Sequence, residues 1–334
     1  MDFQDRHLLT LAQAAFPLVS RPFLDLGDRV GLGEEAVIAR LAALKQARIV
    51  RRIGPVFEPG ALGITTELAA AEVHPDRIEA VGAKVAAWPQ VTHCYERDHR
   101  LNLWFAGAAA SPDWFGQAIK QIANWDGVKE AWRLPTVRRF KIGVVFDLAQ
   151  EHPCAGSAER KVAAAHSAPM ATPNLDPADW GLLRVLEADL PLCGAPFSAL
   201  ATQWQRGEDD LLGAIQAWLT SGRMRRYGAQ LNHRRLGFAA NAMAVWAAPA
   251  DQLGTAGAMM ACDAEVTHCY ERPAFDGFPF NLYAMIHGRS RERCAAVAER
   301  LTRACGLDDP LLLFSSREFK KSSPPLSQLL ASSA

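Results

Sequence analysis

The sequence predicts an α+β protein built as a tandem repeat, in which each half is a winged helix-turn-helix followed by a ferredoxin-like βαββαβ domain. Two observations lead to this prediction. The heptapeptide Val-Thr-His-Cys-Tyr-Glu-Arg occurs twice, letter for letter, at 91–97 and 266–272. Around each copy, apolar residues follow helical and strand spacing in the same order. We expect winged helices at 1–60 and 176–235, ferredoxin-like domains at 61–149 and 236–325, and a linker at 150–175.

The repeat extends well beyond the heptapeptide. Three further pairs of segments correspond: Arg51–Gly54 with Arg225–Gly228, Leu62–Gly63 with Leu236–Gly237, and Arg138–Lys141 with Arg317–Lys320. The second half carries extra residues at 273–279. Between the halves alanine, proline and serine dominate and no periodicity survives, which is typical of a linker.

The elements follow one another in the same order in both halves. Helical spacing at 5–15, 23–30 and 33–47, followed by a strand-like segment at 49–53, predicts a winged helix-turn-helix. Strands are then expected at 65–73, 91–97, 101–106 and from about 128, with helices at 75–88 and 112–124. The second half repeats this with a strand at 240–247, a helix at 250–261, a hairpin at 265–286, a helix at 290–305 and a strand at 310–319.

Composition excludes several classes of protein. The 334 residues are 49% hydrophobic and 22% charged, with 36 basic and 36 acidic residues, so no net field attracts nucleic acid or an anionic membrane. No apolar run approaches the ~20 residues of a membrane span, and the polar N-terminus does not resemble a secretory signal. Seven cysteines without a CxxC pair argue against a disulfide framework or a structural zinc site. We expect a cytoplasmic protein with reduced thiols.

The heptapeptide carries the clearest functional signal. Alternate residues of a strand share a face, so we expect Val91, His93, Tyr95 and Arg97 on one face and the remaining three residues on the other. The second copy should behave in the same way. A lone histidine is more often a core residue, but identical placement in both halves favours a functional role. Cys94 and Cys269 would then face away as small packing residues.

The longer motifs resemble a known family. A winged helix before a ferredoxin-like domain is similar to the Lrp/AsnC family. Within it, Arg-Arg-Ile-Gly-x-Val-Phe at 51–57, Val-Thr-His-x-Tyr-x-Arg-Asp-His-x-x-Asn-Leu-Trp-Phe at 91–105 and Phe-Lys-Ile-Gly at 140–143 resemble one type of siroheme decarboxylase subunit. The segments 268–273, 279–288 and 317–321 resemble the partner type. The chain therefore resembles a fusion of two subunits, as used for haem d1 biosynthesis in denitrifying bacteria; separate subunits serve an alternative haem pathway.

This resemblance implies a lyase of porphyrin biosynthesis that removes the C12 and C18 acetate carboxyls of siroheme, giving 12,18-didecarboxysiroheme and carbon dioxide. The conjugated ring can absorb the charge left on the methylene carbon, so no added cofactor is required. Related decarboxylase subunits or further copies of the chain are open as partners. The protein framework predicts no metal site, although His99 or His287 could ligate the substrate iron.

Candidate residues follow from this chemistry. Protonating the carbanion suits a histidine, and we expect His93 and His268 to donate the proton. Cations should hold the carboxylates that stay, because pairing a cation with the leaving carboxylate would stabilise the reactant. The substrate-binding candidates are Arg51, Arg52, Tyr95, Arg97, His99, Asn102, Trp104, Arg138, Lys141, Arg225, Arg226, Tyr270, Arg272, Asn281, Arg317 and Lys320. Trp104 and Tyr283 could form flat apolar walls, while Asn102 and Asn281 could instead be hairpin anchors.

The rival interpretation is an Lrp/AsnC-type transcriptional regulator that senses a small ligand. In the first half, Arg40, Lys45 and Arg48 could contact DNA. The corresponding helix at 208–218 has three acidic residues and no basic one, so it would be repelled by phosphates. We therefore do not expect DNA to be a partner. A third interpretation, a tetrapyrrole carrier, would keep the arginines without needing both histidines.

Overall fold

The computed structural model describes residues 1–111, 113–143, 145–146, 148, 153–154, 175–238, 240–322 and 324–331. They form two compact units. One unit contains Met1–Leu62 and the described residues of 145–158 and 171–237, and the other contains the described residues of 63–144 and 238–334. The linker predicted at 150–175 lies almost wholly outside the described residues. The predicted fold class is confirmed, with each unit containing corresponding parts of both repeats.

The first unit contains the two winged helix-turn-helix motifs. Their elements are α1 (Phe3–Ala14), α2 (Pro22–Val30), α3 (Glu34–Gln46), β1 (Val50–Phe57), η1 (Pro59–Leu62), α6 (Pro177–Leu186), α7 (Pro196–Trp204), α8 (Glu208–Thr220), β9 (Met224–Leu231) and η4 (His233–Leu236). The helices begin where the sequence supplies a cap. Asp2 and Asp5 form a capping box at α1, and prolines occupy the first turn of α2, α6 and α7. Two short strands, β7 (Val145–Phe146) and β8 (Pro153–Cys154), pair with each other.

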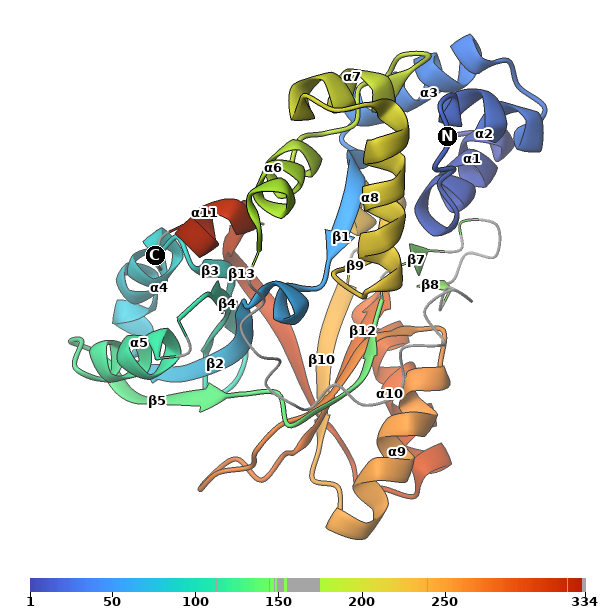
Figure 1. Ribbon diagram of the computed structural model, residues 1–334. Helices are drawn as coiled ribbons and strands as arrows, with labels where there is room; N and C mark the ends of the chain where they lie inside the picture. Colours follow the sequence, from blue (N-terminus) through green and yellow to red (C-terminus); the bar gives the residue numbers. More distant parts are fainter. Residues whose placement is uncertain are drawn as a thin grey trace. The chain divides into compact units, whose positions relative to one another are not determined.

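The wing strands of the two repeats pair with each other. Strands β1 and β9 form an antiparallel ribbon in which Gly54 lies opposite Gly228 (Figure 1). A Cβ atom at Gly228 would lie 2.5 Å from the carbonyl oxygen of Ala12 on α1. Glycine is therefore required where this strand approaches α1.

The second unit is a nine-stranded antiparallel sheet with helices from both repeats. From the first repeat come β2 (Thr65–Val73), η2 (Pro75–Arg77), α4 (Ile78–Ala87), β3 (Val91–Arg97), β4 (Leu103–Ala109), α5 (Trp114–Ala123), β5 (Val128–Leu134) and β6 (Arg138–Ile142). From the second come β10 (Ala240–Trp246), α9 (Ala250–Cys262), β11 (Val266–Glu271), β12 (Leu282–Gly288), α10 (Arg291–Cys305), β13 (Leu311–Lys321) and α11 (Leu326–Ala331). The strand order is β5-β2-β4-β3-β13-β10-β12-β11-β6.

Each repeat completes the sheet of the other. The first residues of the long strand β13 pair with β10 of its own repeat, and its remainder pairs with β3 of the first repeat. In the same way, β5 pairs with β2 of its own repeat, while β6 pairs with β11 of the second. Both heptapeptide strands, β3 and β11, therefore lie between a hairpin partner from their own repeat and a terminal strand from the other.

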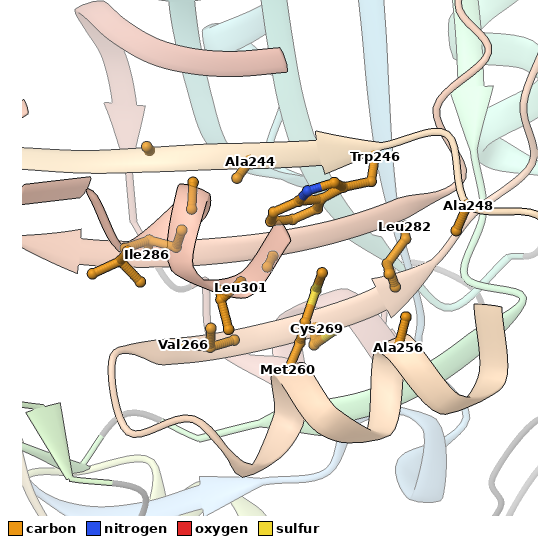
Figure 2. Close-up of a cluster of buried hydrophobic side chains, with 14 of the residues drawn as sticks. Ala244, Trp246, Ala248, Ala256, Met260, Val266, Cys269, Leu282, Ile286 and Leu301 are labelled. Atoms are coloured by element: carbon orange, nitrogen blue, oxygen red, sulfur yellow. The ribbon is translucent and has the colours of Figure 1, made fainter. Parts of the chain in front are cut away.

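The two faces of the sheet differ in what covers them. One face, the helix face, packs against α4 and α5 in the first repeat and α9 and α10 in the second; Figure 2 shows Met260, Ala256 and Leu301 of these helices against Cys269 and Trp246. The opposite face, the inner face, carries a core shared by both repeats. That core contains Trp104, Leu134, Tyr283, Leu313 and Phe278, which comes from the insertion at 273–279.

Candidate functional site

The heptapeptide strands present their histidines on the inner face. Tyr95 lies directly opposite Trp104, an inner-face core residue, and His93 lies opposite Ala106 of the same strand. Tyr270 and His268 hold the corresponding positions opposite Tyr283 and Met285. Both imidazoles are partly exposed, and each lies 6.2 Å from the ring of the tyrosine two residues on, measured between ring centroids.

A register shift changes the predicted face of the valine. Pairing of β3 with β4 is interrupted between Val91 and His93, and that of β11 with β12 between Val266 and His268. This β-bulge adds a residue, so Val91 and Val266 point to the helix face together with the cysteines. The prediction that these valines share the histidine face is wrong. The bulge also brings the threonine hydroxyl beside the imidazole.

The hydroxyl of Thr92 favours one tautomer of His93. Its Oγ1 donates to the carbonyl oxygen of Ala106 at 3.1 Å and lies 3.0 Å from Nδ1 of His93. A hydroxyl has one hydrogen to donate, so the contact with His93 is made by an Nδ1–H donor. In that tautomer Nε2 is the ring atom without a hydrogen when the imidazole is neutral.

The second repeat contains the same arrangement with an additional histidine. Thr267 Oγ1 lies 3.0 Å from Nδ1 of His268, 3.1 Å from Nδ1 of His287 and 3.3 Å from the carbonyl oxygen of Met285. One hydrogen cannot serve three acceptors, so at least one imidazole donates its Nδ1–H to this oxygen. His287 is buried, and burial together with the charge of Lys321 lowers its pKa to about 4. His287 is therefore neutral near pH 7.

Arg97 and Arg272 lie on the inner face but inside the protein. They are 6% and 8% exposed, and each donates from Nη1 to a backbone carbonyl oxygen of the other repeat, Leu313 at 2.5 Å and Leu134 respectively. Burial lowers the pKa of Arg97 to about 10, which leaves it charged at neutral pH, and burial lowers the pKa of Arg272 as well. Within the described part of the chain their Nε atoms have no hydrogen-bond partner. These predicted carboxylate ligands thus connect the repeats.

The four predicted cations of the last strands lie on the helix face. Arg317 pairs with Glu79 of α4 at 2.7 Å, and Lys320 donates to the carbonyl oxygen of Trp88 at 2.7 Å. Arg138 pairs with Glu271 at 3.4 Å, and Lys141 donates to the carbonyl oxygen of Asp263 at 2.6 Å. The structure therefore does not bring these four residues together with the imidazoles, because strand alternation directs them to the opposite face.

Two basic residues next to these cations in the sequence, Lys321 and Arg139, lie on the inner face. Lys321 lies directly opposite His93 in the β13–β3 pairing, and Arg139 lies opposite Tyr270 in the β6–β11 pairing. Sequence reasoning did not select either residue. The repeat gave no signal for either, because Arg139 aligns with Glu318 and Lys321 with Ile142. Both adjoin a predicted cation, but preferring them to that neighbour required the strand register.

The remaining inner-face candidates make contacts within the protein. Trp104 and Tyr283 are only 1% and 2% exposed, and Trp104 Nε1 donates to the carbonyl oxygen of Leu101 at 2.7 Å. His99 Nδ1 accepts from the Leu101 amide at 3.1 Å, its ring packs against Phe278, and burial lowers its pKa. These residues lie at the Arg97 end of the hairpin rather than at the His93 end.

Asn102 and Asn281 hold the strand ends. Asn102 accepts from the Val73 amide at 2.9 Å and donates to the Val73 carbonyl at 2.8 Å. Asn281 makes the same pair of bonds to Ala248, both at 2.8 Å. Both amides are therefore engaged as the hairpin anchors that the sequence left open as an alternative to substrate contact.

The wing arginines belong to the other compact unit. Arg51 is exposed, and Arg52 donates to the Leu186 carbonyl at 3.2 Å. Arg225 donates to the Phe57 carbonyl at 3.2 Å, and Arg226 donates to that of Gln13 at 2.9 Å. Three of the four thus help to join the two winged-helix repeats to each other.

The recognition helices offer little to DNA. Arg40 of α3 pairs with Asp2 at 2.8 Å and Asp5 at 2.7 Å, and Lys45 pairs with Asp189 at 2.5 Å. The first turn of α8 is acidic throughout its three residues. Arg40 and Lys45 are already paired with carboxylates, and the acidic start of α8 would repel phosphate. These helices therefore do not present a basic surface for DNA.

The cysteines of the heptapeptide are packing residues, as predicted. Cys94 and Cys269 are fully buried on the helix face, where burial raises the pKa of Cys94 to about 12 and raises that of Cys269 as well. Among the described residues, no group of three or more His, Cys, Asp or Glu side chains is arranged to hold a metal ion. Within the same residues, no helix combines the length and hydropathy needed to cross a bilayer.

Known families match both kinds of domain. The model of the AsnC-like ligand binding domain matches residues 61–141 and 235–320, and the model of the siroheme decarboxylase NirDL-like HTH domain matches residues 5–51. The two matches to the first model coincide with the two repeats of the sheet unit. The helix-turn-helix model matches within the first winged-helix repeat.

Whole-length relatives share one activity in their names. A siroheme decarboxylase of Hydrogenobacter thermophilus is 36% identical over 94% of this chain and 92% of its own length. The siroheme decarboxylase NirDL subunit of Paracoccus denitrificans is 34% identical over 99% of each chain. A crystal structure of the siroheme decarboxylase NirDL with an iron-uroporphyrin III analogue is 28% identical, covers 99% of this chain and 100% of its own, and has a TM-score of 0.69.

Proposed function

Because this chain belongs to the siroheme decarboxylase family and is a carboxy-lyase, we propose that it removes the C12 and C18 acetate carboxyls of siroheme, giving 12,18-didecarboxysiroheme and carbon dioxide. A relative of similar length has been crystallised with an iron-uroporphyrin III analogue, a tetrapyrrole of the same size class. The iron belongs to the substrate. The conjugated macrocycle can take up the charge left by carbon dioxide, so the reaction needs no further electron-accepting cofactor.

The observation that carries this proposal is the imidazole held by threonine on the inner face, repeated in both halves. When the bond to the carboxyl group breaks, its electron pair stays on the methylene carbon. An imidazolium whose Nδ1–H is bound to threonine can deliver the Nε2 proton to that carbon and become a neutral imidazole. His93 and His268 are therefore the proposed proton donors.

The cations proposed to hold the remaining carboxylates are Lys321 and Arg139, because they share the inner face with the imidazoles. Arginine binds a carboxylate through a planar fork, and lysine as a point charge. Tyr95 and Tyr270 lie on the same face, Tyr270 directly opposite Arg139, and could contact the ring. Arg97 and Arg272, deeper in the protein, contribute positive potential at this face rather than a direct clamp.

The decisive experiment is anaerobic incubation of the purified chain with siroheme, followed by mass spectrometry of the tetrapyrrole. We expect the loss of two carbon dioxide masses. The double variant His93→Asn/His268→Asn should still bind siroheme, measured by its absorbance change, while decarboxylation falls by at least about 100-fold. Normal turnover in this variant would refute the proton-donor assignment. Failure of the wild-type chain to release carbon dioxide, alone and with related subunits added, would refute the proposed reaction.

A further inference from the structure

The two heptapeptide strands are identical in sequence, but their surroundings differ. On the inner face, the two strand neighbours of His268 are apolar, Met285 of β12 and Ile142 of β6; the charge of Lys321 acts on the nearby buried His287. His93 lies between Ala106 of β4 and Lys321 of β13. At the same position of the two repeats, the alkyl side chain of Ile142 therefore neighbours His268, whereas the ammonium group of Lys321 neighbours His93.

The strand neighbours also differ at the next inner-face position. His287 of β12 shares Thr267 with His268. The corresponding residue of the first repeat is Ala108, which packs in an apolar cluster with Ile64 and Leu329 of α11. The hydroxyl of Thr267 is thus held from two sides by imidazoles, whereas Thr92 has one imidazole partner.

The surroundings of His268 and of His93 suit different carboxylates of the substrate. An ammonium beside the departing carboxylate would stabilise the charged reactant more than the charge-dispersed transition state, and would slow the reaction. Apolar neighbours favour the loss of that charge. A carboxylate that stays on the substrate has the opposite requirement, because it is bound most strongly beside a cation.

We propose that the two histidines do unequal work: His268 delivers the proton at the carbon that loses its carboxyl group, and His93, together with Lys321, holds a carboxylate that stays. His287 is a positioning residue that acts on His268 through Thr267. This inference rests on the proposed function and narrows it, because the donor role proposed there for both imidazoles is assigned to His268 alone. In each cycle the carbon–carbon bond to the carboxyl group breaks, carbon dioxide leaves, and the Nε2 proton forms the new carbon–hydrogen bond. The neutral imidazole then regains a proton from solvent.

One consequence concerns the order of events. A single acid serving both acetates requires the singly decarboxylated tetrapyrrole to be repositioned between the two steps. With siroheme in large excess, this intermediate should appear free in solution before the final product. Two acids acting on one bound substrate would release only the doubly decarboxylated product.

Single variants separate the two roles. His268→Asn should lower the single-turnover rate at saturating siroheme by about 100-fold or more for both carboxyls, with the dissociation constant within about threefold of the wild type. His93→Asn should raise the dissociation constant about tenfold and leave the saturated rate within about threefold. Loss of only one of the two carboxyls in each variant, with binding intact, would overturn this inference and leave the proposed function standing. Unchanged rates in both variants would refute the proton-donor role as well.

Exchanging the pseudosymmetric neighbours provides a matched test. Ile142→Lys should slow turnover without weakening binding, and Lys321→Ile should weaken binding without slowing the saturated rate. Lys120→Ile, an exposed residue of α5, controls for the loss of one positive charge and should change neither. An equal effect of the two exchanges on rate would contradict the division of roles.

Two substitutions of His287 test its positioning role through the rate at saturating siroheme. His287→Ala, which copies the first repeat, should lower the saturated rate several-fold at unchanged siroheme affinity. His287→Asn keeps a hydrogen-bonding group near the position of Nδ1 and should restore most of the rate. If alanine and asparagine have the same effect on rate, with both variants folded by circular dichroism, His287 has no positioning role.

Discussion

Replacing Asn281 with alanine tests whether this amide is an anchor or a substrate ligand. Its side chain accepts from the amide of Ala248 and donates to the carbonyl of the same residue, both at 2.8 Å. Ala248 is only 5% exposed, so water cannot fully replace the lost partners. At about 1 kcal/mol for each hydrogen bond, with an added penalty for the unsatisfied backbone groups, we expect the free energy of unfolding to fall by about 2 to 4 kcal/mol.

The assay is urea denaturation followed by tryptophan fluorescence, with Asn102→Ala as the matched variant. Asn102 makes the equivalent two bonds to Val73, at 2.9 and 2.8 Å, so both variants should lose similar stability. Siroheme affinity of the folded protein should stay within about twofold of the wild type, because both amides are held by the backbone of the strand ends and not by the inner face. Stability within about 0.5 kcal/mol of the wild type, combined with weakened siroheme binding, would refute the anchor assignment.

Three further predictions concern protonation, thiol exposure and DNA. Folding lowers the pKa of His287 from 6.5 to about 4, so between these values the unfolded chain takes up a proton at His287 that the folded chain does not. The wild type should therefore lose stability at this residue when the pH falls from 7 to 4.5. Denaturation at the two pH values should show that the His287→Asn variant loses about 2 kcal/mol less than the wild type. Exposed Cys193 and Cys262 should react with a thiol reagent in the native protein, whereas buried Cys94 and Cys269 should react only after unfolding, and rapid native labelling of all four would contradict their packing role. Duplex DNA titrated at low salt should bind no more tightly than about 10⁻⁶ M, and nanomolar, sequence-dependent binding would revive the regulator interpretation.

The order of elements could be predicted from the sequence because its signals are local. Alternation of apolar residues, proline at helix starts and the spacing of turn residues are properties of short windows. The helices expected at 33–47 and 290–305 are observed as Glu34–Gln46 and Arg291–Cys305. Duplication strengthened each assignment, since the same pattern had to hold in both halves.

The orientation of side chains on the heptapeptide strands depended on features that are not local. Alternation predicted the inner-face positions of His93, Tyr95 and Arg97, but the β-bulge before His93 reversed Val91. A bulge depends on how two strands pair, and the sequence of one strand does not specify it.

The last strands show the same limit more severely. Arg317 and Lys320 were chosen because basic residues recur in both repeats, and recurrence does not distinguish the two faces of a sheet. A shift of one residue in register moves a side chain to the opposite face. The register of β13 is set by pairing with β3 of the other repeat, and its two irregularities, before Arg317 and before Lys320, could not be anticipated from either segment alone.

The strand exchange between the repeats has a consequence for synthesis of the protein on the ribosome. Strand β3 pairs with β13, and the bond from Arg97 to Leu313 spans 216 residues of sequence. At a translation rate of 5–20 residues per second, the edge of β3 waits roughly 10 to 40 s for its neighbour to emerge. An open strand edge is a template for association with other chains during that time. A nascent first repeat should therefore depend on chaperones, and a truncated chain ending before β13 should accumulate as aggregate rather than as a smaller folded protein.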